Sequence, residues 1–261
     1  MKVYILTDME GISLVYHWNQ VKQGHPFYER YRSIQAREVN AAIEGALEAG
    51  ATEIVVNDGH GSEDYNLLWE ELHPSIYLER PASSRSILPS LDSSFHSMLF
   101  VGYHAMEGTP AAVMPHTQSS ENWQAYRVNG QVYGEIGQMS LIAGGESVPV
   151  AYISGDRAAV EEARGLLGDD LPGTIVKWGF PGGRARSLHP DEAVHRIRED
   201  VAKALRQERR QPLVREAPYE VQVTFKSTAK ATEFAGRTGV ERVDPFTISK
   251  TVQDVRHILD L

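Results

Sequence analysis

The sequence predicts an α/β protein in which a mostly parallel sheet is followed by a smaller α+β domain. Three observations support this fold class. Short apolar runs rich in β-forming residues recur along the first 185 residues, and a helical pattern separates the first two. Each run ends in turn-forming residues. Beyond residue 185, a long helical pattern precedes alternating, half-buried strand patterns. We therefore expect one domain at 1–185 and a second at 186–261.

Composition excludes several kinds of site and partner. The chain of 261 residues is 41% hydrophobic and 23% charged, so it can bury a sizeable core. It contains no cysteine, which excludes disulfides, thiolate zinc sites and cysteine nucleophiles. A net charge of −9 without a long basic block argues against nucleic acid as a partner. No apolar run approaches about 18 residues and no signal-like start is visible, so we expect a cytoplasmic protein without membrane contact.

The first strand ends in two carboxylates. The apolar run Val3–Leu6 is followed by Thr7, Asp8, Met9, Glu10 and Gly11. In extended backbone, residues i and i+2 point to the same side, so Asp8 and Glu10 could face one point in space. Two such carboxylates repel each other, and a bound cation relieves that repulsion. The alternative is a strand cap beside a solvated turn acid, and this stretch alone does not decide between them.

Two further strands end in histidines. The helical pattern at Tyr31–Ala49 leads to the strand Glu53–Val56, and the resulting βαβ unit predicts that this strand lies parallel to the first. His60 follows this strand, and His104 follows the strand Ser97–Val101. Ligands of open α/β sheets bind at the carboxyl edge of the strands, so both histidines have a route to Asp8 and Glu10.

A third carboxylate follows a predicted hairpin. Asn129-Gly130 is a strong turn signal within the hairpin Asn122–Tyr133, and Glu135 then begins a helix to about Ala143. Taken alone, Glu135 is explained as a first-turn acid that the helix dipole favours. Together with the strand ends it completes a set that suits one or two divalent cations of the zinc type. The set is Asp8, Glu10, His60, His104 and Glu135. The residues thus predict a metal-dependent hydrolase, without indicating its substrate.

The other elements are expected where their patterns begin and end. Expected strands are Ser75–Leu78, Val148–Ser154, Thr174–Lys177, Tyr219–Phe225 and Phe246–Ser249; expected helices are Arg157–Leu167 with Asp156 as N-cap, Pro190 to about Gln207, and Thr251–Leu261. We expect a connection with a short helix at Ser83–Phe95, a flexible loop at Trp178–Leu188 and a linker at Gln211–Pro218. Lys177 and Arg184 could contact a substrate carboxylate, although solvent exposure is the more common outcome.

The motifs resemble those of the zinc-dependent D-aminopeptidases that are encoded with bacterial dipeptide transport systems. The resemblance lies in Thr7-Asp8-Met9-Glu10-Gly11-Ile12-Ser13, Val56-Asn57-Asp58-Gly59-His60, Gly102-Tyr103-His104-Ala105, Val113-Met114-Pro115-His116, Gly134-Glu135-Ile136-Gly137 and Ser154-Gly155-Asp156-Arg157-Ala158. These motifs occur in the family's order across nearly the whole chain.

The resemblance implies a fold, a metal centre and an assembly. It implies a Rossmann-like α/β domain with a smaller α+β domain, and two zinc ions per subunit with Asp8 as the bridging ligand. The other ligands that it implies are Glu10, His60, His104 and Glu135. His116 matches the family's catalytic histidine, assigned there as the nucleophile, although chemistry favours a metal-activated water as attacker and His116 as proton shuttle or oxyanion stabiliser. The implied substrate is a short peptide with an amino-terminal D-residue, and the implied assembly is a homodecamer around a channel.

Two other functions stay open at this point. Dinuclear sites also hydrolyse phosphate esters, for which Lys177 or Arg184 could supply a cationic clamp. A non-catalytic peptide-binding module could keep the metal for stability alone.

Overall fold

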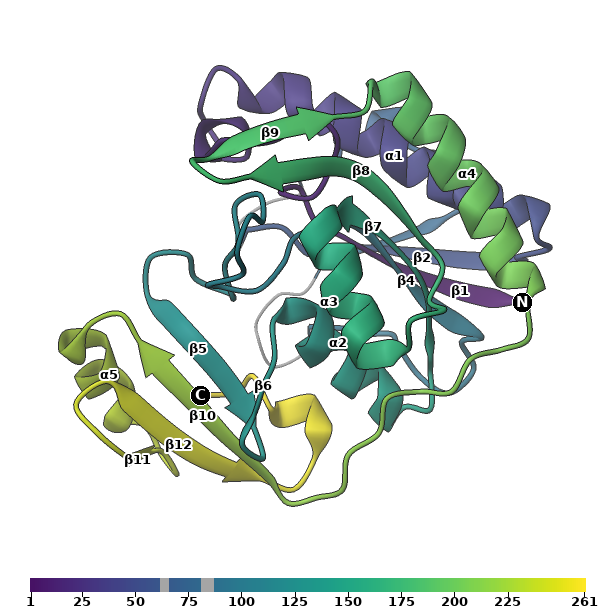
Figure 1. Cartoon of the computed structure of the whole chain (residues 1–261). Coiled ribbons are helices and arrows are strands. Elements are labelled where there is room, and N and C mark those ends of the chain that lie inside the picture. The colour runs from purple at the N-terminus through teal and green to yellow at the C-terminus, as the bar shows by residue number, and fades with distance from the viewer. Residues whose placement is uncertain (62–65, 81–86) are drawn as a thin grey trace.

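The computed structural model describes residues 1–61, 66–80 and 87–261, which form two sheets with helices around the first (Figure 1). Within these ranges the larger sheet has seven strands in the order β3-β2-β1-β4-β7-β8-β9. Their bounds are β1 Lys2–Thr7, β2 Glu53–Asp58, β3 Tyr77–Glu79, β4 Ser97–Tyr103, β7 Val150–Asp156, β8 Gly173–Phe180 and β9 Arg184–Ser187. All neighbouring pairs are parallel except β8 and β9, as the apolar runs predicted for most of the sheet.

The strand order reverses between β1 and β4, which places the functional edge. The chain builds outward from β1 through β2 to β3, then returns to the other side of β1 with β4. Crossover connections therefore leave opposite faces of the sheet at this point, and a crevice opens at the carboxyl ends of the two strands. Asp8 directly follows β1, and His104 directly follows β4. The edge expected to hold a ligand is thus also the edge that carries the predicted site.

Helices cover both faces of the larger sheet. On one face, α1 (Tyr28–Glu48) packs along α4 (Pro190–Arg206). Val3 and Ile5 of β1 belong to the same apolar cluster as the buried side chains of these two helices. On the other face α2 (Glu135–Gly145) and α3 (Arg157–Leu167) pack together and against the sheet. Side chains alternate between the two faces along β1, so Tyr4 and Leu6 belong instead to the apolar cluster that β1 forms with α2 and α3.

The second sheet is antiparallel and draws on distant parts of the chain. Its order is β11-β12-β10-β5-β6, with β5 Trp123–Val128, β6 Gln131–Val132, β10 Tyr219–Phe225, β11 Glu241–Arg242 and β12 Thr247–Val252. The short helix α5 (Thr228–Ala235) packs on it. The predicted hairpin around Asn129-Gly130 is confirmed as β5–β6. The domain boundary near residue 185 stays a prediction; β5 precedes it and pairs with β10, while α4 follows it and packs on α1.

Two predicted segments are wrong, and each has a physical reason. Trp178–Leu188 is not a flexible loop, because β8 continues to Phe180 and pairs with β9, so that Gly182 and Gly183 form only the turn of a hairpin. Thr251–Leu261 is not a helix, because β12 continues to Val252. Only the short 3-10 turn Val255–His257 follows, and Asp254 caps it. The helix predicted within Ser83–Phe95 lies partly outside the described residues.

Three smaller features complete the fold. Two 3-10 turns, η1 (Trp18–Gln20) and η2 (Trp69–Glu71), interrupt the loops after β1 and β2. A third apolar cluster, which includes Met9, Ile12 and Val113, lies beneath the loops that carry the predicted site. In the described part of the chain, no helix combines the length and hydropathy needed to cross a bilayer.

Candidate metal centre

Backbone hydrogen bonds bring the ends of the central strands together. The Asp8 N–H donates to the carbonyl of Val101 at 2.9 Å, and the Gly11 N–H donates to the carbonyl of Gly102 at 2.7 Å. Gly102 has a φ of +75°, and a Cβ atom at this position would lie 2.4 Å from the Asp8 carbonyl oxygen. A glycine is therefore required for the loop after β1 to lie against the end of β4.

Asp8 lies between two histidines. Its Oδ1 is 3.2 Å from Nδ1 of His60, and its Oδ2 is 3.2 Å from Nε2 of His104. The residue is only 5% exposed. One carboxylate thus faces two imidazoles with separate oxygens, an arrangement in which it could be shared by two cations.

A further carboxylate stands beside each histidine. The Oε2 of Glu10 is 3.0 Å from Nδ1 of His60, and the Oε1 of Glu135 is 3.5 Å from Nε2 of His104. Glu135 is the first residue of α2 and also accepts the backbone N–H of Gln118 at 2.7 Å. It is therefore more than a first-turn acid, because its carboxylate points into the cluster.

Backbone carbonyls fix the tautomer of each imidazole. A carbonyl can only accept, so the ring nitrogen that contacts it carries the proton. The nitrogens that donate are Nε2 of His60 to Val21, Nδ1 of His104 to Ala105 and Nδ1 of His116 to Met114, at 2.9, 3.0 and 3.1 Å. The opposite nitrogen of each ring then faces the carboxylates, and it is the nitrogen that a metal could take as its ligand.

The cluster needs positive charge between its members. Burial acts to lower the pKa of His60 and His104, but the negative charges of the neighbouring carboxylates, Glu10 and Asp8 for His60 and Glu135 and Asp8 for His104, raise both pKa values well above the ordinary range. Burial alone would raise the pKa of Asp8, yet the neighbouring imidazoles of His104 and His60 lower it well below the usual range. Protons hold the charges in balance here, and a divalent cation can take their place.

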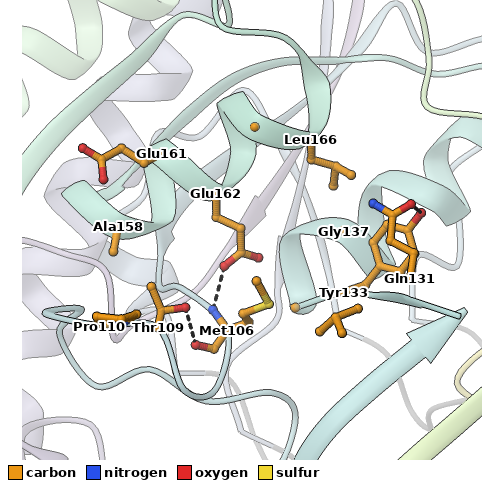
Figure 2. A pocket seen from close by; sticks show the side chains of 13 residues that line it. Met106, Thr109, Pro110, Gln131, Tyr133, Gly137, Ala158, Glu161, Glu162 and Leu166 are labelled. Atoms are coloured by element: carbon orange, nitrogen blue, oxygen red, sulfur yellow. Dashed lines mark hydrogen bonds between the residues drawn. The ribbon is translucent and has the colours of Figure 1, made fainter.

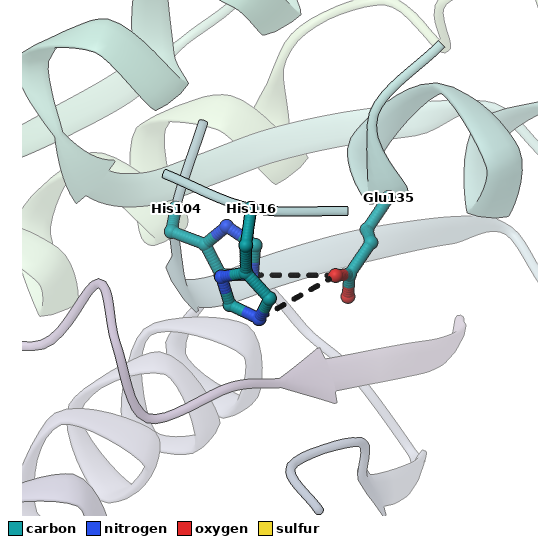
Figure 3. A group of neighbouring side chains, drawn as sticks. All are labelled: His104, His116 and Glu135. Carbon is teal, nitrogen blue, oxygen red and sulfur yellow. Dashed lines mark ion pairs between the residues drawn. The ribbon is translucent and has the colours of Figure 1, made fainter. Parts of the chain in front are cut away.

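His116 lies against the cluster without facing Asp8. Its ring stacks on that of His104 with centroids 3.8 Å apart, and Trp18 contacts it edge-on at 5.2 Å. Figure 3 shows both histidines turned toward Glu135, whose Oε1 is 3.8 Å from Nε2 of His116. Ligand atoms of His104, His116 and Glu135 lie within 4.8 Å of one another, as do those of Asp8, Glu10 and His104. The structure therefore brings all six predicted site residues to one place.

Two cavities lie near this cluster, and only one of them contains it. A cavity of about 350 Å³ is lined by five of the predicted residues together with Trp18, Gly59, Gly61, Gln118 and Ser120. A second, of about 440 Å³, lies between α3 and the β5–β6 hairpin (Figure 2). The structure describes all six predicted residues, and none of them lines the second cavity. Its carboxylate Glu162 accepts the backbone N–H of Met106 at 2.7 Å, just beyond His104.

Two supporting residues have roles that their local sequence does not indicate. Lys177 is fully buried rather than solvent-exposed, and it donates to backbone carbonyls of the loop after β1. Asp156 is the N-cap of α3, as predicted, but its Oδ2 also accepts the N–H of Val113 at 3.0 Å, in the loop before His116. Neither role has a local signal, because each depends on backbone groups more than 40 residues away.

Comparison with known proteins agrees with this geometry. The family model for D-aminopeptidases matches residues 1–261. The D-aminopeptidase of Bacillus subtilis (strain 168) is 36% identical over 206 residues, which cover 78% of this chain and 74% of the relative. Among solved structures, the zinc-dependent D-aminopeptidase DppA from Bacillus subtilis, a self-compartmentalizing protease, superposes with a TM-score of 0.94. It is 30% identical, and the match covers 100% of this chain and 94% of that chain.

Proposed function

The chain belongs to the D-aminopeptidase family and is a zinc-dependent hydrolase of that kind, and we propose that the six clustered residues carry its activity with two zinc ions. The family resemblance and the enzyme class predicted from the motifs are thereby confirmed. The observation that carries the proposal is the position of Asp8, which faces His60 with one oxygen and His104 with the other.

The residues present suit two zinc ions. Asp8 would be shared by the two ions, with Glu10 and His60 holding one of them and His104 and Glu135 holding the other. Carboxylate oxygens and imidazole nitrogens are ligands that zinc accepts in catalytic sites. The Nε2 of His104 supports this fit, because it is buried and has no hydrogen-bond partner although carboxylate oxygens lie 3.2 and 3.5 Å away. Such an atom is aimed at a cation rather than at a hydrogen-bond donor.

His116 is the proposed catalytic residue. When bound, zinc supplies the activation of water and the polarisation of the peptide carbonyl. His116 keeps the proton on Nδ1 for the Met114 carbonyl, so its Nε2 is the atom that can accept and return a proton at the cavity. In its protonated form the same nitrogen can stabilise negative charge that develops on the carbonyl oxygen. The stacked His104 and the edge-on Trp18 hold the ring in place.

The cavity supports a small peptide as substrate and argues against a phosphate ester. Its volume of about 350 Å³ lies at the lower end of the range of about 300–1,000 Å³ for small-molecule sites. Among its described lining residues there is no lysine or arginine. The two cations considered as clamps are engaged elsewhere, because Lys177 is buried and Arg184 donates to the Pro181 carbonyl. A phosphoesterase would need such a clamp.

The related DppA is a self-compartmentalizing protease, which supports a homo-oligomer for this chain. We propose the homodecamer that the motif resemblance implies, located in the cytoplasm. Large exposed apolar side chains such as Trp69 (61%) and Tyr77 (66%) are surfaces that an interface could bury. The mass of the particle by native mass spectrometry tests the decamer, and a monomer at working concentration would overturn it.

Metal content and peptide turnover test the activity. We expect two zinc ions per chain by atomic emission, and release of D-alanine from D-alanyl-D-alanine that stops on chelation and returns with zinc. The same assay on L-alanyl-L-alanine and on a phosphate monoester measures selectivity. A metal-free protein that cleaves as fast as the loaded form, or turnover of the phosphate ester alone, would overturn the proposal.

A further inference from the structure

A lysine that the peptidase chemistry does not use is buried beneath the proposed site. Lys177, on β8, is 0% exposed. Its Nζ donates to three backbone carbonyls, those of Glu10, of Ile12 at 2.9 Å and of Val15 at 2.5 Å. An ammonium group has three N–H donors, so this geometry uses all of them.

Burial of this charge is unfavourable, and hydrogen bonds to backbone carbonyls of the loop offset the cost. An isolated buried ammonium is strongly destabilising unless hydrogen bonds compensate for its lost hydration. Glu10, Ile12 and Val15 are also buried, and they lie in a loop that has no strand partner for their carbonyls. Without Lys177 the buried carbonyls of Glu10 and Val15 would lose their hydrogen-bond donor, and the Ile12 carbonyl would keep only the long bond from the Val15 N–H at 3.4 Å. The lysine thus supplies the hydrogen-bond donors that a neighbouring strand would supply to the carbonyls of a strand.

The loop is held from its other side as well. Its Ser13 N–H donates to Oε1 of the buried Glu38 at 2.8 Å. Lys177 is also the register partner of Asp156 on the neighbouring strand, and Asp156 holds Val113 in the loop before His116. The pair β7–β8 therefore supplies one charged side chain to the loop after β1 and one to the loop before His116.

We propose that Lys177 is a positioning residue that holds the Glu10 backbone and so sets the distance of the Glu10 carboxylate from Asp8 and His60. Its contact is with the carbonyl of Glu10 itself, so a shift of this carbonyl moves the proposed ligand directly. Metal and catalytic sites tolerate displacements of only about 0.5 Å. The inference rests on the proposed role of Glu10 as a zinc ligand.

Zinc binding to Lys177→Met tests the inference, because methionine keeps the length of the chain and removes its donors. Calorimetric titration of metal-free protein with zinc gives the number of ions and an affinity for each. We expect one ion to bind as in the parent and the other to bind about 10–100-fold more weakly, the loss typical of a removed supporting contact. In the Glu10→Gln background, Lys177→Met should cause no further loss, because the ligand that it positions is already absent.

Lys250→Met is the matched control. The Lys250 ammonium also donates to a backbone carbonyl, that of Asp260, but in the second sheet. Both zinc affinities should be unchanged in this variant. Parental affinities for both ions in Lys177→Met, or equal weakening of both, would overturn the role of Lys177. If Glu10→Gln itself binds two ions as tightly as the parent, the proposed metal site fails instead.

A measurement on the unaltered chain serves if Lys177→Met does not fold. Among the described lysines only Lys177 is fully buried, so in protein labelled with ¹⁵N-lysine its ammonium should give a resonance that exchanges slowly with water. Zinc added to the metal-free protein should shift this resonance, and the shift should be absent in Glu10→Gln. A slowly exchanging ammonium resonance that zinc does not move would overturn the inference.

Discussion

A methyl group added at Gly102 tests how the two central strands create the site. In Gly102→Ala the new Cβ would lie 2.4 Å from the Asp8 carbonyl oxygen and 2.7 Å from Cγ2 of Ile12. The left-handed φ of +75° costs an alanine roughly 1–2 kcal/mol. Overpacking of a close contact adds about 1–3 kcal/mol. We therefore expect the free energy of unfolding to fall by about 2–5 kcal/mol.

The same change should impair metal binding, because the crowded atoms belong to the loop of Asp8. The assay is urea unfolding of the metal-free protein, followed by zinc content per folded chain after dialysis. Gly130→Ala is the matched control: Gly130 has a φ of +80° but no atom within 4 Å of the added Cβ. It should lose only the conformational part, roughly 1–2 kcal/mol, and keep its zinc. Equal destabilisation of both variants, with full zinc in both, would refute the reasoning.

Three further predictions concern single side chains. Asp8→Ala should lose both zinc ions and all turnover together, since one ligand serves both; two ions retained per chain would count against a bridge. His116→Ala should keep its zinc by atomic emission and lose turnover of D-alanyl-D-alanine, whereas loss of zinc would make His116 a ligand. Burial raises the pKa of Glu162 to about 7, so the stability that its neutral form provides is present below about pH 4.5 and is lost as the pH rises through 7. Glu162→Gln removes this loss and keeps an acceptor for Met106; relative to the parent it should gain at most about 3 kcal/mol in free energy of unfolding between pH 4.5 and pH 8. A difference between variant and parent that does not change with pH would contradict the ionisation of Glu162.

Much of the first sheet could be predicted because its signals are local. Val3–Leu6 and Ser97–Val101 are apolar runs ended by turn residues, and both are strands. The prediction of a flexible loop after Lys177 is wrong because it rests on local signals alone. Its glycines indicate a turn, but only pairing with β9 makes the flanking residues strands. The helix expected at the carboxyl end failed because cross-strand pairing of Val252 with Tyr219 extends β12 into it.

Local sequence patterns were enough to predict which side chains lie at the carboxyl edge of the sheet. Strand ends are marked locally, so Asp8, His60 and His104 could be assigned to one edge from βαβ logic alone. How these side chains meet follows from packing between distant segments, which places Asp8 between two imidazoles and stacks His116 on His104. The same packing buries Lys177 under the loop after β1 instead of leaving it in solvent. The reason is physical, because the partners of Lys177 are backbone carbonyls, which every residue has, and no residue pattern records which of them a fold leaves unpaired.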